Sequence, residues 1–339
     1  MENPISKFGN KSILLCEDDK IALDYENILN IHYPHKKICY FPAHDSLPFS
    51  SESSSSDILL DRSEKLQTLT HNDIIIITCN NLLKKFQINK DANHFLTLTK
   101  NQTIEANTIL EKLVEFNHSN QANAYNKLEF SLRGDILDIY NSNNNPYRIS
   151  FFDNVIETIK EFNPQTQLTF KDEKERIDIF NPNIELLEPS NKDSYFEDIV
   201  MGYSIYTINR SDIILKEKLN FLKTIFDQVQ PEIPFSNYYL EDNKIENFKF
   251  TNILSSSPKS LKITSNTSLD EFSKMSNKIY FHSGKNSSSI ENEFHQKKNI
   301  EPNYGNNLYF YKSVISKDYL FDGIVHLNKN THTTKKTNL

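Results

Sequence analysis

The segment YRISFFDNVIETIKEF, residues 147–162, predicts a β-hairpin. Its first strand places Ile149 and Phe151 on one face, as expected for side chains that meet a core. The same alternation places Phe152 on the opposite, polar face, which it shares with Arg148. The chain thus contains a large aromatic side chain whose predicted exposure needs an explanation.

Short strands and turn signals surround this hairpin. KLEFSL (127–132) and DILDIY (135–140) precede it, and the Asn-rich cluster NSNNNP (141–146) is typical of a turn. A helix is predicted at residues 105–116. Together these segments predict an α+β domain with an antiparallel sheet over residues 103–195.

The residues before this domain alternate between strand and helix. SILLC (12–16) and the β-branched run DIIIIT (73–78) indicate parallel strands covered on both faces, and residues 18–33 show helical spacing. HFLTLT (94–99) is expected to add another strand. We therefore predict a small parallel-sheet α/β domain over residues 1–102.

The residues after the α+β domain divide into two parts. A helix at 211–229, with one apolar stripe, belongs to a segment (196–262) that we expect to complete the first domain. Strand-like runs such as NKIYFHSG (277–284) predict a second small α/β unit over 263–339. Its last residues, 328–339, have no periodicity and are predicted to be disordered.

Composition excludes several classes of protein. The net charge of −7 argues against a large nucleic-acid-binding surface, which needs clustered Lys and Arg. Cys16, Cys39 and Cys79 lie in or beside apolar runs without a CxxC motif, which favours reduced thiols of a cytoplasmic protein over a metal site. The first 16 residues contain no long apolar segment, so we expect no secretory signal. The sequence also has no apolar run of about 18 residues, the length that spans a membrane.

No motif predicts catalysis. GNKS (9–12) and SGKNSS (283–288) contain Gly and Lys, but neither fits the phosphate-binding pattern GxxxxGK[ST]. We therefore expect no nucleotide or other cofactor, no metal, no catalytic residue and no enzyme activity. Asp135 and Asp138 could be read as a carboxylate pair, but strand alternation puts them on opposite faces, so we expect turn and surface carboxylates.

Two segments resemble a known family. FPAHDSLPFSSESSSSDILLDRSEKLQTL, residues 41–69, is similar to a segment near the N-terminus of the bacterial transcription-repair coupling factor, Mfd. The matching positions are Phe41, Pro42, Asp45, Leu47, Pro48, Asp57, Ile58 and Arg62. The pattern departs at His44, where Trp is usual, and at Phe49, where Tyr is usual.

The second segment, LRGDILDIYNSNNNPYRISFFDNVIETIKEFNPQTQ (132–167), resembles the UvrB interaction domain shared by Mfd and UvrB. Tyr140 and Asn141 replace a Phe-Pro pair, and Lys160 replaces an Arg. The likeness covers residues 12–195. It implies a degenerate helicase-like α/β domain without a P-loop, into which the UvrB interaction domain is inserted.

The resemblance also implies a partner. The middle domain of this family binds UvrA, the damage-sensing ATPase of nucleotide excision repair. Carried over, the UvrA-binding positions are Arg133, Arg148 and Phe152. One alternative stays open for each of two residues. Phe152 could pack under a neighbouring helix or at a bulge instead of being exposed. Arg133 would point inward by strict alternation with Leu137, unless a bulge at Gly134 resets the register.

The sequence therefore predicts an Mfd-like N-terminal module that acts as a cytoplasmic UvrA-binding adaptor in transcription-coupled nucleotide excision repair. We expect the chain to stop before the polymerase-binding and motor domains of Mfd, so RNA polymerase is not expected as a partner and DNA is contacted only indirectly. Two other hypotheses stay open: a decaying remnant that binds little, and one piece of a split ATP-dependent DNA translocase whose motor is on another chain.

Overall fold

The computed structural model describes most of the first 252 residues and five strands after them. The described segments are 11–49, 54–89, 92–141, 145–186, 192, 195–200, 202–208 and 211–252, and the strands between residues 259 and 328 are described by their backbone alone.

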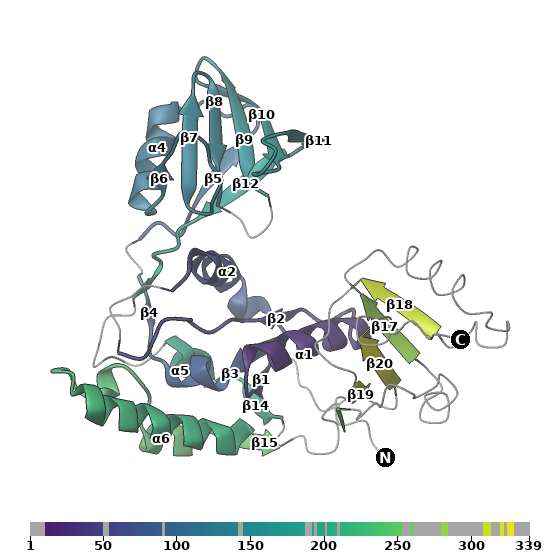
Figure 1. The fold of residues 1–339 in the computed structure, drawn as a ribbon, viewed down its shortest axis with the longest axis vertical. Helices are drawn as coiled ribbons and strands as arrows, with labels where there is room; N and C mark the ends of the chain where they lie inside the picture. Colours follow the sequence, from purple (N-terminus) through teal and green to yellow (C-terminus); the bar gives the residue numbers. More distant parts are fainter. Residues whose placement is uncertain are drawn as a thin grey trace, which may run out of the picture.

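A five-stranded parallel sheet forms the N-terminal α/β unit (Figure 1). Its spatial order is β15-β14-β1-β3-β2, and the strands are Ser12–Cys16 (β1), Ile38–Tyr40 (β2), Ile74–Thr78 (β3), Ser204–Thr207 (β14) and Phe250–Asn252 (β15). All neighbours are parallel. β1 and β3 are buried along their whole length, which confirms the two-sided burial predicted from their apolar runs.

Helices cover both faces of this sheet. They are α1 (Asp19–His32), α2 (Ser56–Leu66), α3 (Cys79–Leu83), α5 (Tyr195–Val200), α6 (Ser211–Val229) and α7 (Asp242–Glu246), with 3-10 turns η2 (Leu69–His71) and η3 (Phe235–Asn237). The apolar side of α1 packs with Leu14 and Ile76. The stripe of α6 packs on the opposite face, with Ile13 and Ile77. Alternate residues of each central strand thus feed two separate cores.

The inserted α+β module contains a six-stranded sheet in the order β11-β10-β9-β8-β7-β6 and the helix α4 (Ala106–Glu115). The strands are β6 (Ser119–Asn120), β7 (Glu129–Arg133), β8 (Ile136–Ile139), β9 (Tyr147–Phe152), β10 (Val155–Phe162) and β11 (Thr169–Glu173). β6 and β7 are parallel and the other neighbours are antiparallel. The predicted hairpin is confirmed as β9–β10, with Phe152 opposite Val155.

One strand belongs elsewhere than expected. The segment 94–99 forms β5 (Phe95–Thr99), but it pairs antiparallel with β12 (Arg176–Phe180) and not with the parallel sheet. Leu98 of β5 packs in the core of the inserted module. The expectation that this strand extends the first sheet is therefore wrong, because its partner comes from a distant part of the sequence. The domain limits 1–102, 103–195, 196–262 and 263–339 stay predictions.

A second pair of short strands joins the chain that enters the module to the chain that leaves it. β4 (Gln87–Ile88) pairs antiparallel with β13 (Glu185–Leu186). Near it, the Ser63 hydroxyl of α2 donates to the carbonyl of Asn181 at 2.6 Å.

The C-terminal strands form a mixed sheet in the order β16-β19-β20-β17-β18. They are β16 (Lys259–Ser260), β17 (Ile279–Ser283), β18 (Leu308–Lys312), β19 (Tyr319–Phe321) and β20 (Ile324–Asn328). β17 is parallel to both of its neighbours, and it confirms the strand predicted at 277–284. The tail predicted to be disordered lies, after Asn328, outside the described residues. No helix in the described segments has the length and apolar character needed to cross a membrane.

Candidate partner-binding site

The polar face of the six-stranded sheet brings the two predicted arginines together. In the antiparallel register Arg148 of β9 lies opposite Asp138 of β8, and Arg133 of β7 lies opposite Ile136. Residues directly opposite one another share a face of the sheet. β7 and β8 are joined by two residues, of which Gly134 has a φ of +58°. This tight turn, not a bulge, places Arg133 on the polar face.

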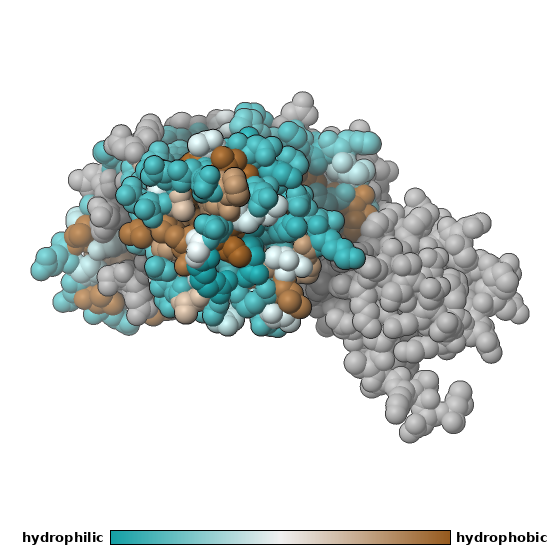
Figure 2. Space-filling view, turned by 90° about the horizontal axis from the view of Figure 1, so that it is seen from above, coloured by the Kyte–Doolittle hydropathy of each residue, from teal (hydrophilic) through white to brown (hydrophobic). Residues whose placement is uncertain are grey.

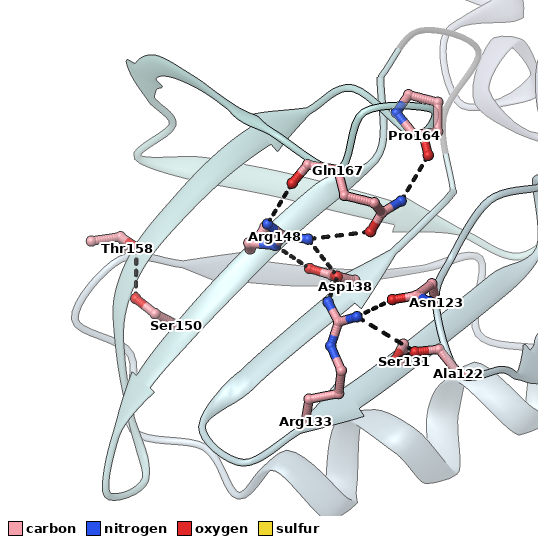
Figure 3. Close-up of polar contacts among 10 residues, drawn as sticks. All are labelled: Ala122, Asn123, Ser131, Arg133, Asp138, Arg148, Ser150, Thr158, Pro164 and Gln167. Atoms are coloured by element: carbon pink, nitrogen blue, oxygen red, sulfur yellow. Dashed lines mark hydrogen bonds and ion pairs between the residues drawn. The ribbon is translucent and has the colours of Figure 1, made fainter.

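Arg148 is held firmly in place (Figure 3). Its Nε and Nη2 donate to the two carboxylate oxygens of Asp138 at 2.6 and 2.8 Å. Nη1 donates to the carbonyl of Gln167 at 2.9 Å, and Nη2 also donates to the Gln167 side chain at 3.4 Å. The guanidinium lies 4.6 Å from the centre of the buried Phe162 ring. The hydrogen bond with Asp138 raises the pKa of Arg148 above its usual value.

Arg133 shares the same carboxylate but is more open to solvent. Its Nη2 donates to Asp138 Oδ2 at 2.6 Å, and its Nη1 donates to the side chain of Asn123 (Figure 3). The Arg133 side chain is 43% exposed, whereas that of Arg148 is 20% exposed. The two arginines are therefore fixed side by side, and Arg133 is the more accessible of them.

Asp138 is the residue that the sequence analysis misplaced. It was expected at the surface, and it is fully buried between the two guanidinium groups. The expected exposure holds for its companion Asp135, which lies in the β7–β8 turn. Alternation along β8 assigns Asp138 to the polar face, but its burial comes from the arginines of the two neighbouring strands, which only the pairing register reveals.

Phe152 is exposed on this same face, as the alternation predicts. It is 72% exposed, whereas the adjacent Phe151 is 6% exposed and belongs to the core of the module. The alternative in which Phe152 packs under a helix or at a bulge is therefore wrong. Ile136, 40% exposed and opposite Arg133, adds an apolar side chain that the sequence analysis missed. The signal in the sequence that could have indicated the exposure of Ile136 was its position beside the Gly134 turn.

A second polar cluster is buried in the α/β unit, at the strand by which the chain returns from the module. Arg62 of α2 is fully buried. Its Nε and Nη2 donate to the carboxylate oxygens of Glu185 in β13 at 2.8 and 2.6 Å. Nη1 donates to Asn81 Oδ1 at 2.8 Å and to the carbonyl of Pro42. Arg62 thus ties α2 to β13.

The charge state of this cluster follows from its burial. Desolvation would raise the pKa of Glu185, but the Arg62 charge and the hydrogen bond from His44 outweigh it and hold this pKa at about 2. Desolvation and the Arg62 charge lower the pKa of His44. His44 is therefore neutral at pH 7, and its 3.0 Å contact with Glu185 is a hydrogen bond and not an ion pair. Because these side chains are buried, we assign them a role in stabilising the fold.

Comparison with known proteins identifies the inserted module. The family model of the UvrB interaction domain matches residues 96–187. Residues 96–187 form a UvrB interaction domain. The matched range includes β5 except its first residue, Phe95, and all six strands of the main sheet. The polar face with Arg133, Asp138, Arg148 and Phe152 therefore belongs to this domain.

The chain is similar to transcription-repair-coupling factors over half to two thirds of its length. It is 29% identical over 212 residues to that of Rickettsia bellii, covering 61% of this chain and 18% of that protein. It is 32% identical over 172 residues to that of Rickettsia conorii (49% and 15%), and 27% identical over 224 residues to that of Staphylococcus haemolyticus (65% and 17%). The matches thus span less than a fifth of these relatives.

These findings confirm the resemblance that the segments 41–69 and 132–167 indicated. The chain carries an Mfd-like N-terminal module around its UvrB interaction domain. The roles of Arg133, Arg148 and Phe152 toward a partner stay predictions. Across the described segments, no group of three or more His, Cys, Asp or Glu side chains is arranged to hold a metal ion.

Proposed function

We propose that the chain is a cytoplasmic UvrA-binding adaptor in transcription-coupled nucleotide excision repair. The observation that carries this proposal is Phe152, which is exposed on the same polar face of the UvrB interaction domain as Arg133 and Arg148. The relatives in which such a module occurs bear the name transcription-repair-coupling factor.

The physical chemistry of this face suits protein recognition. Aromatic and Arg side chains carry most of the binding energy in protein interfaces, and residues held rigidly before binding lose little entropy on association. Phe152 follows directly on Phe151, which is anchored in the core, and both arginines are held by Asp138. The face is therefore pre-organised for a protein partner.

We further propose that the chain contributes binding and not nucleotide hydrolysis. Phosphate groups bind where the first N–H groups of a helix are unpaired. At the β1–α1 junction the Asp18 carboxylate accepts the Ile21 N–H at 2.8 Å, and Asp19 adds a second acidic side chain in the first turn. Two carboxylates at this position repel a phosphate group, which supports an adaptor role.

The test is a calorimetric titration of the chain with purified UvrA from the same organism. We expect saturable binding by the unmodified chain, and a loss of about 30-fold for Phe152→Ala, since a central aromatic residue typically contributes ~2 kcal/mol or more. A matched control is Phe170→Ala, which removes another exposed phenylalanine of the same domain, from β11. Absence of binding by the unmodified chain overturns the proposed function.

A further inference from the structure

The register of the C-terminal sheet sorts its residues onto two faces of different composition. The surface shown in Figure 2, by contrast, is mainly hydrophilic, and apolar groups interrupt it in several places. Residues paired in register share a face, and alternate residues of a strand take opposite faces. The backbone pairing of β17, β18, β19 and β20 therefore assigns each of their residues to a face (Figure 1).

One row of this register crosses four adjacent strands and consists of aromatic residues that carry polar atoms. Its members are Tyr319 (β19), His326 (β20), Tyr280 (β17) and Tyr309 (β18). Neighbouring strands lie about 4.8 Å apart, so the four positions extend over roughly 14 Å. We call these four residues the aromatic row. The same face also carries, on one side of the row, Asn328, His282 and Tyr311 and, on the other side, Phe321 and Ile324.

The opposite face is apolar along the middle of the strands. It carries Ile279 and Phe281 of β17, Leu308 and Phe310 of β18, Leu320 of β19, and Val325 and Leu327 of β20. Parallel strands that are covered on both faces have near-continuous apolar runs, as β1 and β3 do. Strands β17, β18 and β20 instead mostly alternate between apolar residues and Tyr, His or Asn. Only the apolar face thus has the composition of a core face, and the aromatic row lies on the other.

The charge of the chain is unevenly distributed along the sequence. Residues 253–339, which include this sheet, contain 12 Lys and 7 Asp or Glu, a net charge of +5. The whole chain has a net charge of −7, so residues 1–252 contribute −12. Opposite charge in two parts of one chain is typical of a basic segment that binds a polyanion. The negative total therefore does not describe the C-terminal residues.

Aromatic rings and a positive charge together complement a single strand of nucleic acid. Bases stack on Tyr and His rings of neighbouring strands in a sheet, and Lys side chains pair with phosphates. A duplex keeps its bases stacked on one another, so it offers none to such a row. A membrane surface is met by Lys together with Trp, Phe or Leu, and the aromatic row contains none of these three apolar types.

The residue types of this face favour RNA over DNA. Tyr hydroxyls, neutral His rings and the Asn amide each both donate and accept hydrogen bonds. The 2′-hydroxyl of RNA also donates and accepts, and it is the group by which a protein distinguishes RNA from DNA. Phe would serve equally for stacking alone, and Phe281 and Phe310 lie on the apolar face.

We propose that the face of the C-terminal sheet that carries the aromatic row binds single-stranded RNA. The bases stack on the row, the phosphates pair with lysines of residues 253–339, and the 2′-hydroxyls bond to the polar atoms of Tyr and His. This inference goes beyond the proposed function and does not depend on it, because the sheet lies outside the UvrB interaction domain, residues 96–187.

Fluorescence anisotropy of a labelled oligonucleotide, titrated with the full chain, measures this binding. The probe is an unstructured RNA of about 12 nucleotides at near-physiological salt, compared with single-stranded DNA of the same sequence and with a DNA duplex. We expect saturable binding of the RNA, about tenfold weaker binding of the single-stranded DNA, which lacks the hydrogen bonds of the 2′-hydroxyls, and no binding of the duplex. Absence of RNA binding overturns the proposal, and equal affinity for RNA and single-stranded DNA overturns the choice of RNA.

Tyr280→Leu removes one ring of the aromatic row and should weaken RNA binding about tenfold, the typical loss for one stacked base. The matched control is Tyr125→Leu, which removes an exposed tyrosine of the inserted module and should bind RNA like the unmodified chain. Thermal melts of both variants show whether the fold is kept. Normal RNA binding by a folded Tyr280→Leu variant overturns the proposal.

Two further measurements hold even where Tyr280→Leu fails to fold. Tyr280→Phe combined with Tyr309→Phe keeps both rings and removes two hydroxyls, so it should keep DNA binding and reduce the preference for RNA; an unchanged preference overturns the role of the hydroxyls. Cross-linking of the unmodified chain to an RNA that contains 4-thiouridine, followed by mass spectrometry, locates the contact. Cross-links in β17, β18 or β20 support the proposal, and cross-links confined to residues 1–252 overturn it.

Discussion

Replacing Glu185 by Gln should destabilise the α/β unit far more than the loss of an ordinary carboxylate. Arg62 is fully buried, and Glu185 is the carboxylate that neutralises it. Glu185→Gln keeps the shape of the side chain but leaves the guanidinium without a counter-charge. Removing one partner of a buried ion pair typically costs about 3–5 kcal/mol, because the remaining charge stays desolvated.

The pKa of Glu185 gives an independent estimate of the same size. This pKa is about 2 in the folded chain and about 4.3 for an unperturbed Glu, and the difference corresponds to about 3 kcal/mol. Because the folded pKa is depressed, the stabilisation is complete above a pH of about 4.3 and is lost as the pH falls toward the folded value. The unmodified chain and Glu185→Gln should therefore differ at pH 7 and converge in acid.

Chemical denaturation followed by circular dichroism at pH 7 and at several acidic pH values measures this difference. The matched control is Asp61→Asn on α2, the helix that carries Arg62, which removes the half-buried partner of Lys65 in a 2.8 Å ion pair near the surface. Such a surface pair contributes less than about 1 kcal/mol. Equal losses for Glu185→Gln and Asp61→Asn, or a difference that persists in strong acid, would refute the argument that Glu185 compensates a buried charge.

Three further predictions concern the core, a helix start and a buried histidine. Phe151→Ala should lower the free energy of unfolding by about 3–5 kcal/mol, whereas Phe152→Ala should change it by less than about 1 kcal/mol, because only Phe151 is buried. Thermal melts of both variants measure this, and a larger loss of stability for Phe152→Ala than for Phe151→Ala would mean that the two side chains face the opposite way. Asp18→Ala removes the side-chain acceptor of the Ile21 N–H and should cost about 1 kcal/mol, whereas Asp18→Asn should recover most of it; equal stability of all three proteins would exclude a capping role. Burial lowers the pKa of His118 to about 4, so its contribution to stability is complete above its unfolded pKa of about 6.5 and is lost as the pH falls toward the folded value. His118→Gln should remove this part of the pH dependence, and an unchanged pH profile would contradict it.

The sequence by itself determined the elements and the facing of the key strand. The apolar run at 12–16 and the β-branched run at 73–78 indicate strands buried on both faces, and the structure has them in the centre of the parallel sheet. Alternation along β9 requires Phe151 and Phe152 to face opposite sides, because side chains of a strand repeat every two residues. Exposure of Phe152 therefore follows from local geometry alone.

Only the tertiary structure decided which strands meet. β5 pairs with β12, far along the chain, and no local pattern in 95–99 distinguishes that partner from the parallel sheet. The face of Arg133 depends on the two-residue turn at Gly134, which restarts the alternation between β7 and β8. The burial of Asp138 depends on Arg133 and Arg148, which reach it from the strands on either side. Periodicity describes one strand at a time, whereas a charge cluster is made by the register between strands, and this register is a property of the folded sheet.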